Sequence, residues 1–161
     1  EITEEVFWRA VGARPIGATV VTAQYQDTKA GFLGLSFAHV SARPPIVLVS
    51  VSRSTTALAA ILASKAFAVS ELPDCSEAVA RAFGGGKPNQ DRFLDRDWES
   101  FVSGAPIYPN AVVAFDCELH RTIEEGDTIL VLGRVRGIRI GQPGGVTVAH
   151  RGTYENLFLK K

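Results

Sequence analysis

The segment GFLGLSFAHVSARPPIVLVSVS, residues 31–52, decides the fold that we expect for this chain. It holds two apolar runs, residues 31–41 and 44–52, which are rich in β-branched or aromatic side chains and meet at two prolines. This composition predicts strands separated by a turn. Residues 17–26 and 66–72, on either side of the segment, have the same character, so we expect four strands in this part of the chain.

A longer strand pair is predicted in the second half. Residues 111–120 alternate between an apolar and a polar face, which is the period of a half-buried strand. The apolar face carries Val113, Phe115, Cys117 and Leu119, and the polar face carries Asp116, Glu118 and His120. Residues 124–127 supply a turn, and residues 128–140 form the returning strand of an antiparallel hairpin. Gly133 and Gly137 are expected at bulges, because the apolar alternation changes phase there.

Helices are few. Thr3 can cap a helix that ends near Gly12, and a run of good helix formers predicts a second helix over residues 55–62. A third helix is expected over residues 74–83, followed by a mobile loop over residues 84–90. Many strands without regular strand–helix alternation predict a mainly β protein, an antiparallel barrel with a few helices, and argue against a doubly wound nucleotide fold.

The composition describes an ordinary globular protein. The chain has 161 residues, of which 46% are hydrophobic, and we expect one domain over residues 1–161. Its 17 basic residues balance 17 acidic ones, so neither nucleic acid nor a membrane surface is an expected partner. No apolar run approaches the roughly 18 residues of a membrane span. We expect the natural N-terminus to be missing, because residue 1 is Glu.

The cysteines and histidines do not indicate a metal. Cys75 and Cys117 are far apart in the sequence and predict neither a zinc site nor a disulfide framework, so a reducing cytoplasm is the expected compartment. His120 is expected to face solvent. His39 interrupts an apolar strand and is expected either to be buried and hydrogen-bonded or to line a ligand site.

The common catalytic motifs are absent from the sequence. It has no HExxH, no P-loop and no GxSxG, so zinc proteolysis, P-loop hydrolysis and one type of serine hydrolysis have no support. No catalytic side chain is therefore predicted.

Residues 52–56, SRSTT, form a candidate anion site. They lie where a strand passes into a helix, and hydroxyls, an arginine and free helix amides together favour a phosphate. The alternative is a helix cap beside an exposed arginine. Arg92 and Phe93 pair a cation with a ring, which can serve a phosphate and a ring or can anchor a loop.

In their order and spacing, these pieces resemble the short-chain flavin reductase family of FMN-binding split-barrel proteins. The resemblance covers almost the whole chain. It rests on GATVVTA at residues 17–23, on residues 31–52, and on Ser54-Thr55, Arg81-Ala82-Phe83, Asp91-Arg92-Phe93, Gly104-Ala105-Pro106, Gly126-Asp127, Gly133-Arg134-Val135 and Arg151-Gly152-Thr153-Tyr154. The implied fold is an antiparallel, Greek-key-like split barrel that binds FMN at a homodimer interface.

The resemblance also implies binding residues. Leu35, Ser36, Phe37 and Ala38 would run beside the isoalloxazine ring, and Tyr154 would approach it from the C-terminal segment. The phosphate or ribityl chain would be held by Ser52, Arg53, Ser54 and Thr55, with help from Arg92 and Phe93. On this basis the expected activity is an NAD(P)H-dependent flavin reductase that supplies reduced flavin to a partner monooxygenase.

Three departures from the family pattern keep alternatives open. Leu33 and Leu35 replace the usual Thr and Asn of the flavin strand, His39 replaces a Ser, and Thr128 stands where the family places a histidine at the nicotinamide site. The acceptor could therefore be a corrinoid, or the protein could be a non-enzymatic flavin- or haem-binding split barrel. FMN or FAD, and NADH or NADPH, are all compatible with the sequence.

Overall fold

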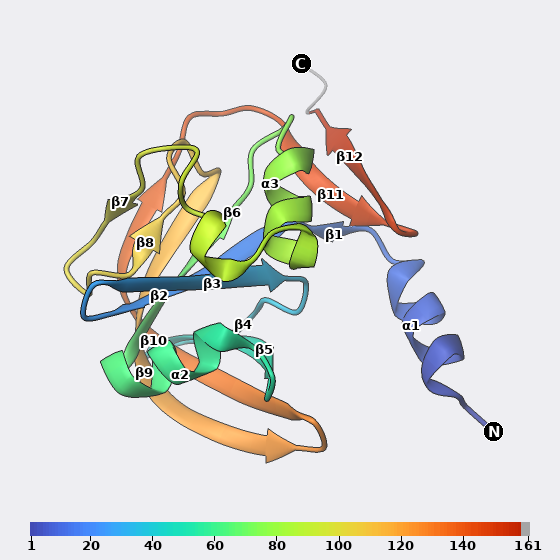
Figure 1. Cartoon of the computed structure of the whole chain (residues 1–161), viewed down its shortest axis with the longest axis horizontal. Coiled ribbons are helices and arrows are strands. Elements are labelled where there is room, and N and C mark those ends of the chain that lie inside the picture. Colours follow the sequence, from blue (N-terminus) through green and yellow to red (C-terminus); the bar gives the residue numbers. More distant parts are fainter. Residues whose placement is uncertain (159–161) are drawn as a thin grey trace.

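The computed structural model describes residues 1–158 and consists mainly of antiparallel strands (Figure 1). Seven strands form the main sheet, in the order β3-β2-β6-β9-β10-β5-β4. Their bounds are β2 (Thr19–Tyr25), β3 (Thr28–Gly34), β4 (Ala38–Ala42), β5 (Pro45–Ser52), β6 (Ala66–Glu71), β9 (Val113–Glu125) and β10 (Thr128–Ile140). The edge strands β3 and β4 are joined by residues 35–37 and do not pair with each other, so the barrel is split at this point. The predicted split-barrel fold is confirmed.

Smaller elements complete the chain. A three-stranded sheet contains β1 (Ile16–Gly17), β11 (Val146–His150) and β12 (Thr153–Leu157), and a short pair contains β7 (Glu99–Ser100) and β8 (Pro106–Ile107). The helices are α1 (Glu4–Gly12), α2 (Thr56–Ser64) and α3 (Glu77–Arg81), followed by the single-turn segments η1 (Ala82–Gly86) and η2 (Asn89–Asp91). No helix among residues 1–158 has the length and apolar character needed to cross a membrane.

The prediction of one strand over residues 31–41 is wrong, because the chain changes neighbours within this segment. β3 pairs with β2, whereas β4 pairs with β5 at the opposite edge of the sheet. A strand cannot follow both ladders, so residues 35–37 leave the sheet. The Ser50 N–H donates to Ser36 Oγ at 2.9 Å and fixes the break against β5.

The predicted hairpin of β9 and β10 is confirmed, with a tight turn at Gly126 and Asp127. Gly126 has φ +58°, a conformation that glycine adopts without strain. The register shifts between Leu132 and Gly133 and between Val135 and Gly137, which confirms the two bulges. The polar face predicted for β9 is only partly correct. His120 is exposed, but Asp116 is buried and accepts hydrogen bonds from Ser103.

The third helix begins later than predicted, at Glu77. The residues before it are held against β11, because the Asp74 N–H donates to the carbonyl of Gly145 and the Ser76 N–H donates to Thr147 Oγ1. Residues 84–90, predicted as a loop, instead contain the end of η1 and the start of η2.

Two apolar clusters lie within the fold. One gathers around Phe67, Val49 and Val131, and the other contains Phe83 and Phe93, with Trp98 packed against it. Strand β2 contributes to both, because Val20 lies in one cluster and Val21 in the other. Helix α1 contributes to neither: it buries none of its residues and stands apart from the barrel (Figure 1).

Candidate functional site

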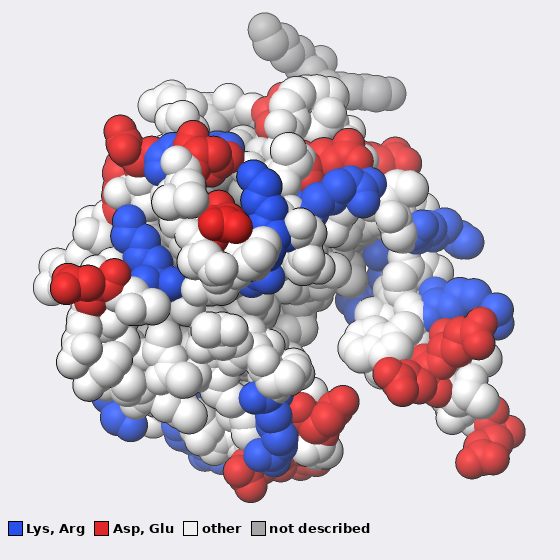
Figure 2. All heavy atoms as spheres, viewed as in Figure 1, with Lys and Arg blue, Asp and Glu red and all other residues white. Residues whose placement is uncertain are grey.

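A cavity of about 660 Å³ lies between α1 and the barrel. Seven parts of the fold line it: α1, the α1–β1 link, the β3–β4 break, the end of β5, the end of α3, the β9–β10 turn and the β11–β12 turn. In the space-filling view it is a hollow between α1 and the body of the molecule (Figure 2). Its volume falls in the usual range of small-molecule sites.

One side of the cavity, the serine side, presents hydroxyl groups. Ser50 and Ser52 come from β5, Ser36 from the β3–β4 break and Thr128 from the start of β10. The Thr128 hydroxyl donates to Asp127 Oδ1 at 3.1 Å. Leu35, which is 39% exposed, adds an apolar patch beside Ser36. This side can therefore contact a flat apolar ring and hydrogen-bond its polar edge.

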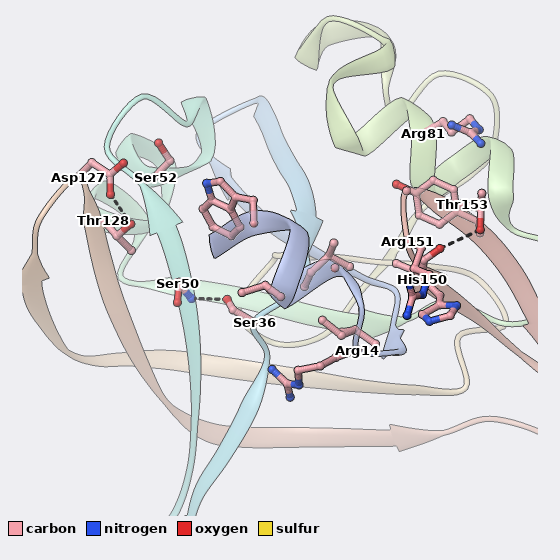
Figure 3. A pocket seen from close by; sticks show the side chains of 18 residues that line it. Arg14, Ser36, Ser50, Ser52, Arg81, Asp127, Thr128, His150, Arg151 and Thr153 are labelled. Carbon is pink, nitrogen blue, oxygen red and sulfur yellow. Dashed lines mark hydrogen bonds between the residues drawn. The ribbon is translucent and has the colours of Figure 1, made fainter. Parts of the chain in front are cut away.

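The other side, the arginine side, presents the three arginines Arg14, Arg81 and Arg151, together with His150. Figure 3 shows Arg81, His150, Arg151 and Thr153 grouped at one end, with Ser52, Asp127 and Thr128 at the opposite end and Arg14 between them. The cavity thus has three arginines and one aspartate in its lining, and the aspartate lies far from the arginine end.

Arg81 is the most firmly placed of these cations. Its guanidinium donates to Glu77 Oε1 at 3.0 and 2.8 Å, one helical turn away. It also lies over the ring of Tyr154, 5.1 Å from the centroid. The pair joins α3 to β12 and belongs to the wall of the main cavity and of a smaller one of about 560 Å³.

The sequence model of the flavin reductase like domain matches residues 11–157, which is most of the chain. The chain belongs to the flavin reductase-like family. It is 33% identical over 140 residues to the FMN reductase (NADH) RutF of Ancylobacter novellus, covering 87% of this chain and 77% of RutF. The crystal structure of the NADH:FAD oxidoreductase SgcE6 of Streptomyces globisporus C-1027 superposes with a TM-score of 0.88 at 32% identity, covering 96% of this chain and 94% of SgcE6.

A third member of the family is longer than this chain. The stachydrine N-demethylase reductase subunit Stc3 of Rhizobium meliloti is 32% identical over 146 residues, which is 90% of this chain. The chain spans only 63% of the length of Stc3.

Within this flavin reductase-like fold, the structure brings five of the predicted site residues together. Leu35, Ser36, Ser52, Thr128 and Tyr154 all line the cavity. They come from positions up to 119 residues apart in the sequence, and the split barrel places them around one space.

Other predicted residues of the flavin strand lie outside the cavity lining. Phe37 packs on Phe115, with ring centroids 5.3 Å apart. Ala38 and His39 are exposed on β4, an edge strand that pairs only with β5. Of the two alternatives for His39, the buried, hydrogen-bonded one is therefore wrong, and a role at a ligand site stays a prediction.

The predicted phosphate residues are divided. Ser52 lines the cavity and its Oγ lies 3.0 Å from Ser54 Oγ, but Ser54 and Thr55 lie outside the lining. Arg53 turns to the β9–β10 turn, where Nε donates to the Gly126 carbonyl at 3.2 Å and Nη1 lies 3.4 Å from Glu124 Oε1. The cap position of α2, Thr55, forms no side-chain capping bond.

Arg92 and Phe93 lie against β3, outside the cavity lining, and anchor a loop. The Arg92 guanidinium donates to the carbonyls of Gly31 at 2.6 Å and Lys87 at 2.9 Å. Partial burial lowers the pKa of Arg92. Phe93 is buried against Phe83 and Trp98. Both side chains therefore anchor a loop in this structure, which is the second of the two roles considered for them.

Sequence reasoning missed most of the arginine side and the helix. It singled out residues 151–154 but assigned a role only to Tyr154, and it gave no site role to Trp8, which lines the cavity while 59% of it is exposed. A signal was available in α1, whose Val6, Phe7 and Trp8 form an apolar group on a helix too short to be stable alone.

Proposed function

We propose that this protein is an NAD(P)H-dependent flavin reductase with FMN as its flavin. The observation that carries the proposal is the composition of one cavity, in which exposed apolar groups, hydroxyls and arginines surround a space of about 660 Å³. A flavin mononucleotide has the matching parts: a flat apolar ring with a polar edge, a hydroxylated chain and a phosphate. The name of RutF, an FMN reductase (NADH), supports the choice of flavin and donor.

The protein's part is binding and orientation. The flavin, when bound, supplies the hydride acceptor for the nicotinamide. Leu35 would offer its apolar side chain to the ring, and Ser36 and Ser50, joined by the bond from the Ser50 N–H to Ser36 Oγ, would hydrogen-bond the polar groups of the ring. Trp8 shields the space on the side of α1. No side chain of the cavity has to act as a nucleophile, so the absence of catalytic motifs from the sequence agrees with this chemistry.

The phosphate of FMN is assigned to the end of β5 and the start of α2. Ser52 lines the cavity there, and the amides at the start of α2 have no side-chain cap, so they can donate to an anion. Arg53 is close in sequence, but its guanidinium is engaged by Gly126 and Glu124. The arginine would have to leave these acceptors to reach the phosphate.

We further propose that the active form is a homodimer. Helix α1 has nine residues and no buried side chain, although Val6, Phe7 and Trp8 are apolar. Isolated helices of this length are marginal in water, so α1 needs a surface to cover its apolar face. A second copy that packs on α1 would also close the cavity.

The proposed partner is an oxygenase that receives the reduced flavin, because the family member Stc3 is the reductase subunit of stachydrine N-demethylase. The cytoplasm remains our proposed compartment, since Cys75 and Cys117 are both free.

The experiment is anaerobic reduction. The purified protein is mixed with FMN, then with NADH or NADPH, and the absorbance of oxidised flavin is followed. Bleaching that depends on the protein supports a reductase, and its absence with both donors overturns the proposal. Saturation of the rate by free FMN separates a diffusible flavin from one that stays bound. Sedimentation at several protein concentrations tests the dimer.

A further inference from the structure

The turn between β9 and β10 brings Asp127 to the cavity lining, together with Thr128 at the start of β10. Arg53 lies outside the lining, although it directly follows Ser52, which lines the cavity. We infer that Arg53 is a positioning residue: it holds the β9–β10 turn at the end of β5, keeps Asp127 and Thr128 in the cavity wall, and does not bind the flavin phosphate. The inference rests on the proposed function, because it states how one wall of the flavin site is kept in place.

The first argument is that Arg53 is bonded to the turn by its main chain and by its side chain. The Arg53 N–H donates to the Asp127 carbonyl at 3.1 Å, and Nε donates to the Gly126 carbonyl at 3.2 Å. Nη1 lies 3.4 Å from Glu124 Oε1. Three groups of one arginine therefore contact three different residues of the turn.

The second argument is that the turn has little other support. β9 pairs with β6 only as far as Glu118, and β10 pairs with β5 only as far as Thr128, which is opposite Ser52. Residues 124–127 lie beyond both pairings and are all exposed, so burial does not fix them. A two-stranded hairpin on its own is marginally stable in water. The bonds from Arg53 therefore have a large share in fixing the position of this turn.

The third argument is the short path from Arg53 to the cavity. Thr128 follows the bonded carbonyl of Asp127, and its hydroxyl donates to Asp127 Oδ1 at 3.1 Å. Figure 3 shows Ser52, Asp127 and Thr128 together at one end of the cavity. A shift of the turn would therefore move Asp127 and Thr128 relative to Ser52 and change the serine side of the cavity.

The same contacts argue against a phosphate at Arg53. Its guanidinium already has a carboxylate, from Glu124, and a main-chain carbonyl, from Gly126, as partners. A phosphate beside Arg53 would also lie close to the Glu124 carboxylate, and like charges repel. The ion pair itself is exposed on both sides and contributes little stability, so we expect the bond to the Gly126 carbonyl to be the more important contact.

The test is equilibrium binding of FMN and of riboflavin, which lacks the phosphate, followed by flavin fluorescence. In Arg53→Ala we expect both Kd values to rise about fivefold, the factor that corresponds to one hydrogen bond of ordinary strength. Arg121→Ala is the matched control, because Arg121 is an exposed arginine of the same hairpin outside the cavity lining. Both Kd values should stay within about twofold in this control. A loss that falls on FMN and spares riboflavin would overturn the inference and assign Arg53 to the phosphate, and an equal loss in Arg121→Ala would reduce the effect to net charge.

Glu124→Ala is a second measurement, in which the two roles of Arg53 predict opposite results. The variant removes one acceptor and leaves the guanidinium free to turn. A phosphate-binding Arg53 would then reach FMN more easily, and Kd for FMN would fall. A positioning Arg53 loses one contact with the turn, so Kd for FMN stays within about twofold or rises. A fall of more than about twofold would contradict the inference.

The visible spectrum of FMN bound at saturation separates positioning from a general loss of stability. A displaced serine side changes the surroundings of the flavin, so the spectrum in Arg53→Ala should differ from that in the parent protein. A variant that is merely less stable binds FMN in the parent's site, with the parent's spectrum, and that result would sink the inference. Arg53→Lys, whose ammonium can still donate to the Gly126 carbonyl, should recover part of the affinity for both flavins.

Hydrogen exchange of the ligand-free protein tests the turn without any flavin. Arg53→Ala should speed the exchange of the amides of residues 125–128, whereas Arg121→Ala should leave it as in the parent protein. Unchanged exchange in Arg53→Ala would show that Arg53 does not hold the turn. Failure of the proposed function has a different signature: the parent protein would bind neither FMN nor riboflavin, and the faster exchange in Arg53→Ala would still be seen.

Discussion

The Arg81 guanidinium lies 5.1 Å above the centroid of the Tyr154 ring, and this pair separates the main cavity from the smaller one beside it. The contact ties α3 to β12, two elements that are otherwise joined by few interactions. Cation–π contacts at exposed sites contribute about 0.5–1 kcal/mol. A double-mutant cycle of Arg81→Ala and Tyr154→Leu should therefore give a coupling of that size in urea unfolding. If the effects of the two single substitutions simply add, the Arg81 guanidinium and the Tyr154 ring lie side by side without a stabilising interaction.

Trp8 should control flavin affinity from α1. Removing the indole in Trp8→Ala takes an apolar wall from the cavity, and we expect Kd for FMN to rise about tenfold, equivalent to about 1.4 kcal/mol. Val6→Ala is the matched control, because Val6 is also exposed on α1 but lies outside the lining. Fluorescence titration with FMN gives both values. An equal rise of Kd for FMN in Val6→Ala would show that α1 supports FMN binding through its helical structure and not through the indole of Trp8.

Glu71 should make stability depend on pH. Burial raises the pKa of this carboxyl from its ordinary value of 4.5 to about 7. The folded protein therefore holds a proton that the unfolded chain releases above pH 4.5, and stability falls as the pH rises towards 7, by at most about 1.4 kcal/mol per pH unit. Glu71→Gln should flatten the free energy of unfolding between pH 5 and 7. An unchanged slope in this variant would assign the dependence to other groups.

Ser103 should be more important to stability than its exposed position implies. Its hydroxyl donates to the buried carboxylate of Asp116 and accepts the Ala105 N–H at 3.1 Å. In Ser103→Ala the Asp116 carboxylate loses the hydroxyl donor and keeps the backbone N–H of residue 103, at 3.3 Å. The expected loss is about 1–3 kcal/mol, measured by chemical denaturation. Ser103→Thr keeps a hydroxyl and should recover most of it; failure to recover would point to the loop backbone instead.

The two thiols should differ in reactivity. Cys75 is exposed, whereas burial raises the pKa of Cys117 to about 12. Because the thiolate is the reactive form, Ellman's reagent at pH 8 should modify one thiol in the native protein and two in denaturant. Cys75→Ser should show none in the native state. A rapid second thiol in the native protein would contradict the burial of Cys117.

Much of the fold could be predicted from local patterns. The strands, the β9–β10 hairpin and its bulges are confirmed because alternation and glycine placement are local signals. The break at residues 35–37 could not be seen, since an apolar run looks the same whether it keeps one partner strand or exchanges it for another. Asp116 was placed on a polar face for a similar reason: its partner, Ser103, is distant in sequence from the alternating pattern.

The site was predicted in part. Leu35, Ser36, Ser52, Thr128 and Tyr154 surround the cavity because their motifs mark points where strands end or break. Arg53 has the right residue type at a promising position, but the acceptors that hold it lie on the β9–β10 turn, next to the end of β5 and about 70 residues later in the sequence. The arginine side could not be predicted from the sequence, because its residues come from separate segments that are brought together only in the folded protein.

The weak attachment of α1 has a consequence for ligand exchange. Because α1 buries none of its residues in the core, a displacement of α1 about its bonded end at Gly12 would disturb neither apolar cluster. The free energy of opening the cavity is then separate from the free energy of unfolding the barrel. Residence time of a reduced flavin and thermal tolerance of the protein can thus be tuned by different residues, the first within α1 and the second within the sheet.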